Sequence, residues 1–222
     1  MSEQVNTRPR RHRDVPAAIS GTTTAASGTA TPAAAAAPAA TAGPGAKRLH
    51  RSNAPTIAYD DLGMGDAALL FMPGWCVGRS VFASLPARCA EQRRVLALDW
   101  RGHGESGAAT ADFGDRELVE DAADLIAASG VKRVIAVALA HSGWVALELR
   151  RKRGPMVERI VLIDWLVAEP PAPFGDALAA LQHSQRWQTA RDELFATWLR
   201  GVGRPELESF IYSNLGAYDF RM

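Results

Sequence analysis

A strand-to-helix turn at residues 138–144, with the sequence ALAHSGW, is the stretch best suited to hold a nucleophile. A nucleophile in so tight a turn needs small residues two places before it and two places after it. If Ala138 and Ser142 are these small residues, the centre of the turn is Ala140. If Ser142 is the centre, the flanking residue Trp144 is far too large for its place. We therefore expect alanine at the nucleophile position, and alanine excludes ordinary catalysis through an acyl-serine.

Four short apolar runs, separated by helix-like segments, place this turn in a sheet. The runs cover residues 67–72, 94–98, 133–139 and 158–163, and helices are expected at 80–92, around 118–126 and at 141–153. Gly130 is a candidate C-cap for the second of these helices. Apolar strands that alternate with helices predict an α/β fold, with a mostly parallel sheet and helices on both faces. Ligands bind such sheets at the carboxyl ends of the strands, here residues 74–76, 99–106, 140–141 and 164.

Three parts of different composition follow one another along the chain. Residues 1–46 are rich in Ala, Pro and Thr and have few large apolar side chains, so we expect a disordered tail. Residues 47–168 are expected to form the α/β core. Residues 169–222 carry helical patterns rich in aromatic residues, at 177–187, 192–199 and 207–214, and we expect them to form a helical cap over the strand ends.

Charge and composition exclude several classes of function. The formal net charge is only +1, which favours neither nucleic acid nor membrane as a partner. The tail arginines leave a transit peptide or a basic nucleic-acid arm as alternatives, and a solvated tail is the expectation. The two cysteines, Cys76 and Cys89, suit neither a disulfide framework nor a metal site, which favours a reducing, cytoplasmic setting.

Several motifs resemble a known fold family. FMPGW at 71–75, LDWRGHGES at 98–106 and the turn at 138–143 resemble the oxyanion loop, the loop after the next strand and the nucleophile elbow of the α/β-hydrolase superfamily. A narrower set, PGWC, WRGHG, HSGWVALEL, IDWL and FATWL, resembles the cofactor-independent 2,4-dioxygenases of 3-hydroxy-4-quinolones. Those enzymes use no metal or flavin, cleave the quinolone ring with dioxygen and release carbon monoxide. The resemblance implies a small aromatic heterocyclic substrate, dioxygen and no cofactor.

The resemblance also implies roles for individual residues. Asp164, the aspartate of IDWL, would belong to a His–Asp dyad that removes the substrate's hydroxyl proton, although an aspartate here could also only cap a turn. The backbone N–H groups of Trp75 and His141 would form an oxyanion hole. Trp198 would shield the dioxygen pocket, and it could equally be part of the cap core.

Four further positions complete the expected site. Ala140, Ser142 and Trp165 would line the pocket for substrate and dioxygen. Ala140 stands where the family usually has a serine that holds the substrate, and Leu139 stands where a histidine is expected. His103, in RGHG, is expected to fix its own loop.

The catalytic histidine of the resembling family comes from a loop after the last strands. No histidine follows His183 in this sequence, and the chain stops at Met222. We therefore expect the fold to lack its last strands, to self-associate through an exposed sheet edge, and to have little or no dioxygenase activity. Two alternatives stay open: an α/β-hydrolase acting on esters or amides through Ser142, and a non-catalytic protein that binds small molecules.

Overall fold

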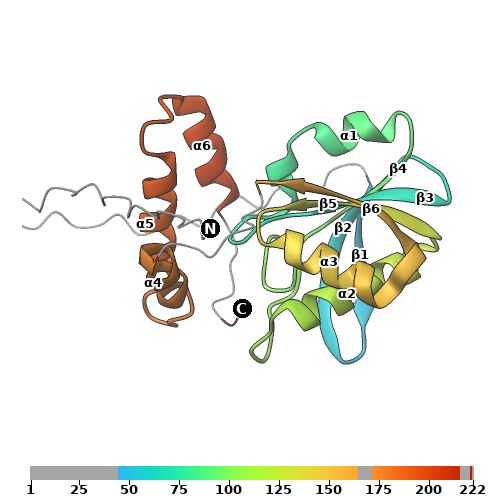
Figure 1. Cartoon of the computed structure of the whole chain (residues 1–222), viewed down its shortest axis with the longest axis horizontal. Coiled ribbons are helices and arrows are strands. Elements are labelled where there is room, and N and C mark those ends of the chain that lie inside the picture. The colour runs from blue at the N-terminus through green and yellow to red at the C-terminus, as the bar shows by residue number, and fades with distance from the viewer. Residues whose placement is uncertain (1–44, 165–171, 216–220, 222) are drawn as a thin grey trace, which may run out of the picture. The chain divides into compact units, whose positions relative to one another are not determined.

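A mostly parallel sheet forms the centre of the computed structural model, which describes residues 45–164, 172–215 and 221 (Figure 1). Among these residues the strand order is β1-β2-β4-β3-β5-β6. β1 and β2 run antiparallel to their neighbours, and β3 to β6 are parallel to one another. The strands are β1 (Ala46–Arg51), β2 (Ala54–Leu62), β3 (Ala67–Met72), β4 (Arg94–Leu98), β5 (Arg133–Leu139) and β6 (Val157–Ile163).

The predicted α/β class is confirmed, and β3 to β6 lie where the apolar runs indicated. The hairpin of β1 and β2 was not predicted. Its first strand, AKRLHR, is mostly polar and partly exposed, so it lacks the continuous apolar signal of the inner strands. The predicted tail lies outside the described residues except for its last two, and Ala46 already begins β1.

Helices cover both faces of the sheet, as Figure 1 shows: α1 (Leu85–Ala90) lies on one face, and α2 (Asp115–Ser129) and α3 (Ser142–Arg153) on the other. Gly130 has a φ of 72° and caps α2, as expected. The helix predicted at 80–92 is instead the short 3₁₀ segment η1 (Arg79–Phe82) followed by α1. Ala83, with a φ of 49°, breaks the helix between them.

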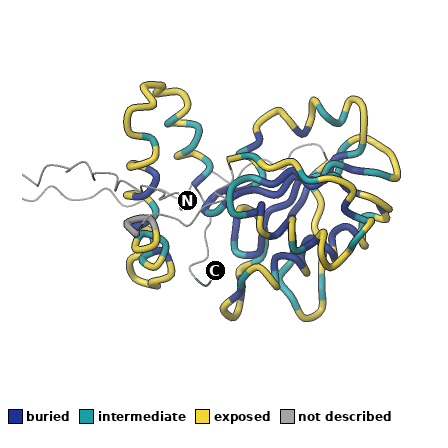
Figure 2. The backbone as a smooth tube through the Cα atoms, viewed as in Figure 1, coloured by how far each residue is buried: buried dark blue, intermediate teal, exposed yellow. Residues whose placement is uncertain are grey.

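The two faces of the sheet have separate cores, because successive residues of a strand point to opposite sides. Leu70 and Leu96 pack with α2 and α3, whereas their neighbours Phe71 and Val95 pack toward η1 and α1. Figure 2 shows the central strands as the most continuously buried part of this body. Burial on both faces explains why these strands are apolar throughout.

Three helices form the cap region: α4 (Ala172–Leu181), α5 (Trp187–Leu199) and α6 (Pro205–Asn214). Leu181, Leu194 and Phe195 are buried in one apolar cluster together with Cys76 and Val77 from the loop after β3. This cluster brings the cap helices against the carboxyl end of β3. The described part of the chain contains no helix that is long and apolar enough to cross a bilayer.

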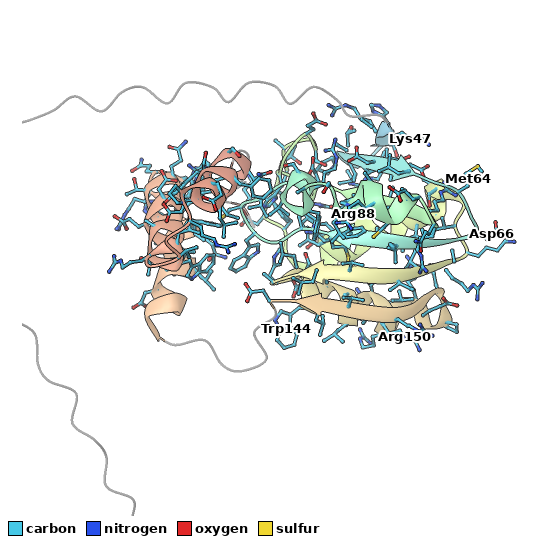
Figure 3. All side chains as sticks on the ribbon, turned by 90° about the horizontal axis from the view of Figure 1, so that it is seen from above. Lys47, Met64, Asp66, Arg88, Trp144 and Arg150 are labelled. Carbon is cyan, nitrogen blue, oxygen red and sulfur yellow. The ribbon has the colours of Figure 1, made fainter. Side chains whose placement is uncertain are left out.

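β6 lies at the end of the sheet, and no strand pairs with its outer edge among the described residues. Val161 is 45% exposed and Leu162 is 39% exposed. Trp144 on α3 is 52% exposed, and in Figure 3 Trp144 and Arg150 mark the same side of the sheet as β6. An apolar edge of this kind favours pairing with another chain.

Candidate active site

The turn between β5 and α3 has the geometry of an elbow centred on Ala140. Its φ is 50°, a left-handed value that few non-glycine residues adopt. Its N–H donates to the Ile163 carbonyl at 2.9 Å, and its carbonyl accepts from the Gly143 N–H at 3.0 Å. Non-glycine residues keep such backbone strain mainly at functional sites, so the elbow position belongs to Ala140.

Ser142 lies two residues beyond this centre and is fully buried. Its hydroxyl donates to the Pro73 carbonyl at 2.5 Å and accepts from the Trp100 indole N–H at 3.1 Å. Trp100 also donates to Pro73, at 2.9 Å. The Ser142 hydroxyl therefore links the loops after β3 and β4 to the start of α3. Its proton is used in the hydrogen bond to the Pro73 carbonyl.

The loop after β3 approaches the elbow closely. A Cβ atom added at Gly74 would lie 3.5 Å from the Cβ of Ala140. Trp75 follows Gly74, and His141 follows Ala140. The backbone N–H groups of Trp75 and His141 have no acceptor among the described residues. Both groups are available to a ligand oxygen, and their role as an oxyanion hole stays a prediction.

The side chains of the same two residues form a stacked pair. The rings of Trp75 and His141 have centroids 5.1 Å apart and an interplanar angle of 29°. His141 keeps some exposed surface, but both of its ring nitrogens are buried. Those nitrogens and the indole nitrogen of Trp75 have no hydrogen-bond partner among the described residues.

Three buried polar atoms without partners are costly, at about 1–3 kcal/mol for each. Burial also lowers the pKa of the His141 imidazole to about 3, and nearby His103 acts in the same direction. The imidazole is therefore neutral near pH 7, with one donor nitrogen and one acceptor nitrogen. Native structures rarely leave such groups unpaired without a functional reason.

Arg79 anchors the loop after β3 to the loop after β4. Its guanidinium pairs with Asp99, with Glu105 at 2.7 Å and with Asp60 at 3.1 Å. Its backbone N–H donates to Asp99 at 2.5 Å. Burial opposes the charge of Arg79, but these carboxylates outweigh burial and raise the pKa of the guanidinium. The pairs fix the loop that carries Trp75.

Asp164 ends β6 with a φ of 49° and is exposed. Its carboxylate has no hydrogen bond or ion pair within the part of the chain that the structure describes. No described histidine is therefore bonded to it. The His–Asp dyad therefore stays a prediction. Asp164 is the member of it that the described residues include.

Of the predicted pocket residues in the cap region, Trp198 lies on α5. It is 48% exposed and packs edge-on against Phe195, with ring centroids 5.0 Å apart. Trp165 lies outside the described residues. The geometry brings together Ala140, Ser142, His141 and Trp75.

Two structural contributors were missed in the sequence. Trp100 is fully buried and holds Pro73 and Ser142, and Arg79 organises three carboxylates. A signal existed for Trp100, because an aromatic residue with a polar N–H follows a buried strand. His103 behaves as expected, since its Nδ1 lies 3.0 Å from the Arg101 carbonyl of its own loop.

Metal ligands are not gathered in this region. Across residues 45–164 and 172–215, no three His, Cys, Asp or Glu side chains are placed to hold a metal ion. Next to Ala140, the site contains the backbone N–H groups of Trp75 and His141, the neutral imidazole of His141 and the indole N–H of Trp75. Such a site can bind and orient a polar aromatic molecule.

Comparisons with known proteins agree with this geometry. A 2-heptyl-3-hydroxy-4-quinolone dioxygenase of Rhodococcus erythropolis is 35% identical over 169 residues, which are 74% of this chain and 63% of the relative. A 2-heptyl-3-hydroxy-4(1H)-quinolone dioxygenase of Mycobacteroides abscessus is 32% identical, covering 77% of this chain and 64% of the relative. The chain thus spans less than two thirds of the length of these curated relatives.

A solved structure is similar as well. An AqdC variant in complex with its substrate, from work on recognition and ring cleavage of the Pseudomonas quinolone signal, superposes with a TM-score of 0.71 at 26% identity. The match covers 80% of this chain and 67% of that one. The model of the alpha/beta hydrolase family matches residues 69–218. Because this match covers more than half of a chain that also has the expected sheet and elbow, the protein belongs to the alpha/beta hydrolase family.

Proposed function

We propose that the chain belongs to a protein that binds 3-hydroxy-4-quinolones for cofactor-independent 2,4-cleavage by dioxygen with release of carbon monoxide. The observation that carries the proposal is the elbow centred on Ala140, in a chain whose relatives are quinolone dioxygenases. A dioxygenase of this type needs a bound, deprotonated substrate and no acyl-enzyme. Loss of a serine hydroxyl at the elbow is therefore tolerable.

The hydrolase alternative is weaker on the same observations. Ala140 offers no hydroxyl, and the Ser142 hydroxyl is buried between Pro73 and Trp100. A nucleophilic serine needs a free path to the substrate and a base within hydrogen-bond reach. Ser142 has neither in the described structure.

In this proposal each site residue has a defined part. The backbone N–H groups of Trp75 and His141 hold the substrate oxygen that gains negative charge. Ala140 and Ser142 shape the pocket floor, and Trp165 and Trp198 shield the dioxygen. Asp164 orients an imidazole that takes the hydroxyl proton.

We further propose that the 222-residue chain alone turns substrate over slowly or not at all. The described residues pair no imidazole with Asp164, and His141 is a weak base because burial lowers its pKa to about 3. Quinolone binding without turnover is therefore the second candidate function. It is supported by an Asp164 carboxylate that no described residue pairs with, and by backbone N–H groups at Trp75 and His141 that have no acceptor among the described residues.

The test combines two measurements on the chain. Intact-mass analysis after treatment with a fluorophosphonate probe should show no covalent adduct, whereas labelling of Ser142 would establish the hydrolase. Oxygen uptake with 2-heptyl-3-hydroxy-4-quinolone should be far below that of the Rhodococcus relative in parallel. Matched turnover would overturn the proposed impairment and support the dioxygenase activity directly.

Two further proposals concern the setting of the protein. Self-association through the outer edge of β6 is supported by the exposure of Val161 and Leu162. A reducing, cytoplasmic location is supported by Cys76 and Cys89, which are both free thiols. Sedimentation velocity tests the first, and fractionation of the source cells tests the second.

A further inference from the structure

Two side chains beside the elbow have hydrogen-bonding atoms that the fold leaves unused. The indole nitrogen of Trp75 and both ring nitrogens of His141 are buried and have no hydrogen-bond partner in the described part of the chain. The rings are stacked against each other, 5.1 Å apart, so their polar atoms belong to one local region.

The position of this pair is set by the elbow. His141 follows Ala140 directly in the chain, and Trp75 follows Gly74, whose Cβ position would contact Ala140 at 3.5 Å. Trp75 also packs against the cluster of cap residues that includes Leu181 and Leu194. The pair therefore lies between the elbow and the cap, where a substrate of this fold would be held.

The chemistry of the pair matches one arrangement of ligand atoms. An indole N–H only donates, whereas a neutral imidazole has one donor and one acceptor. Two donors and one acceptor complement a hydroxyl group next to a carbonyl group. A carbonyl accepts hydrogen bonds from the donors, and the hydroxyl donates a hydrogen bond to the imidazole acceptor.

We propose that the side chains of Trp75 and His141 recognise the hydroxy-ketone edge of the substrate, with the imidazole accepting from the hydroxyl and the indole N–H donating to the carbonyl. This inference rests on the proposed function and adds a specificity-determining pair to it. It gives the side chains of Trp75 and His141 a role in substrate recognition, whereas the oxyanion hole uses only the backbone N–H groups of these two residues.

In this proposal His141 recognises the substrate hydroxyl and does not act as the base that removes its proton. Burial keeps its imidazole neutral, with a pKa of about 3, so it accepts a hydrogen bond from the hydroxyl of the bound substrate, and the proton itself passes in the reaction to the imidazole that Asp164 orients. Because the nitrogens are buried, a substrate reaches them only if side chains of the cluster around Trp75 shift.

Three ligands test the inference on the unaltered chain: 2-heptyl-4-quinolones with a hydroxyl, a methoxy group or hydrogen at position 3. Calorimetric titrations are run without oxygen, so that no ligand is consumed. The hydroxyl compound should bind about tenfold more tightly than the other two, the factor that corresponds to one good hydrogen bond. The methoxy compound cannot donate, so it should bind like the unsubstituted one or more weakly.

Variants then assign the discrimination to the pair. His141→Phe should bind all three ligands with similar affinity, and His183→Phe, at an exposed histidine of the cap region, should retain the preference of the wild type. Trp75→Phe should weaken all three ligands by a similar factor, because they share the carbonyl.

The outcomes separate this inference from the proposed function. Quinolone binding without a preference for the hydroxyl, or a preference that survives in His141→Phe, overturns the inference and leaves the proposed function standing. Failure of the wild type to bind any of the three compounds overturns both. If His141→Phe does not fold, equal binding of the hydroxyl and methoxy compounds by the wild type still overturns the inference.

Discussion

Single side chains decide which chemistry this elbow permits. Ala140 occupies a strained backbone position, with a φ of 50°, but has no group that can attack a substrate. Ser142 is the nearest hydroxyl in sequence and is used for structure, between Pro73 and Trp100. The sequence could predict this register, because the bulk of Trp144 excludes a centre at Ser142. It could not predict the unpaired atoms of Trp75 and His141, since these depend on contacts between separate loops.

Replacement of Ser142 by alanine should reduce stability and not create or abolish a catalytic function. The Pro73 carbonyl keeps its bond from Trp100, so the expected loss is about 1–2 kcal/mol in the free energy of unfolding. Urea denaturation measures it. Ser213→Ala, at an exposed serine on α6, is the control and should change stability by less than about 0.5 kcal/mol. Equal effects of the two changes would argue against the structural role.

His141 should make stability depend on pH. Its folded pKa is about 3, below the ordinary value of 6.5, so between these pH values the unfolded chain binds a proton that the folded chain does not. Its contribution is therefore complete above pH 6.5 and decreases as the pH falls, by about 1.4 kcal/mol per pH unit. Urea denaturation at pH 8, 6.5 and 5 should show this extra decrease in the wild type compared with His141→Gln. Parallel pH profiles would show that His141 is accessible to protons in the folded state.

At the scale of elements, four parallel strands bring separate loops to one end of the sheet. The inner strands were predictable because burial on both faces makes them apolar throughout. The hairpin of β1 and β2 was not, because half of the residues of β1 are exposed, among them the charged Lys47 and Arg48. Nor was the break before α1, since it depends on Ala83 adopting a positive φ. Figure 3 marks the two ends of the sheet, with Asp66 just before β3 and Trp144 just after the elbow.

Arg79 should anchor the loop after β3 to the loop after β4. Its side chain is 10% exposed and faces three carboxylates, so Arg79→Gln leaves buried Asp99 without its cation. We expect a loss of about 3 kcal/mol in the free energy of unfolding. The matched control is Arg116→Gln, whose side chain is 76% exposed in its pair with Glu117. That change should cost about 0.5 kcal/mol or less, and a similar cost for both would contradict the anchoring role.

At the scale of the whole molecule, β1 and β6 are the two outer strands of the sheet among the described residues, and the outer edge of β6 is the apolar one. This edge follows from the order of the strands, which alternation of strands and helices alone does not determine. Leu162 and Val161 expose apolar surface along it. An exposed sheet edge was expected from the sequence, and we propose that the protein self-associates through it.

A charge on β6 should reduce self-association. Leu162→Lys places an ammonium group on the exposed edge, where lysine is a common protection against strand pairing. Sedimentation velocity over a range of concentrations should show a smaller associated fraction than in the wild type. Leu207→Lys on α6 is the control, because Leu207 is 38% exposed and Leu162 is 39% exposed. If both variants associate like the wild type, the β6 edge is not the interface.

The central claim is that a quinolone binds at an elbow whose centre is alanine. The direct measurement is an anaerobic calorimetric titration of the chain with 2-heptyl-3-hydroxy-4-quinolone, beside the variant Ala140→Trp, which fills the space at the elbow. We expect the wild type to bind the quinolone saturably, with one ligand per chain. A folded Ala140→Trp protein should have lost this binding. Absence of saturable binding in the wild type, or undiminished binding in Ala140→Trp, would contradict the claim.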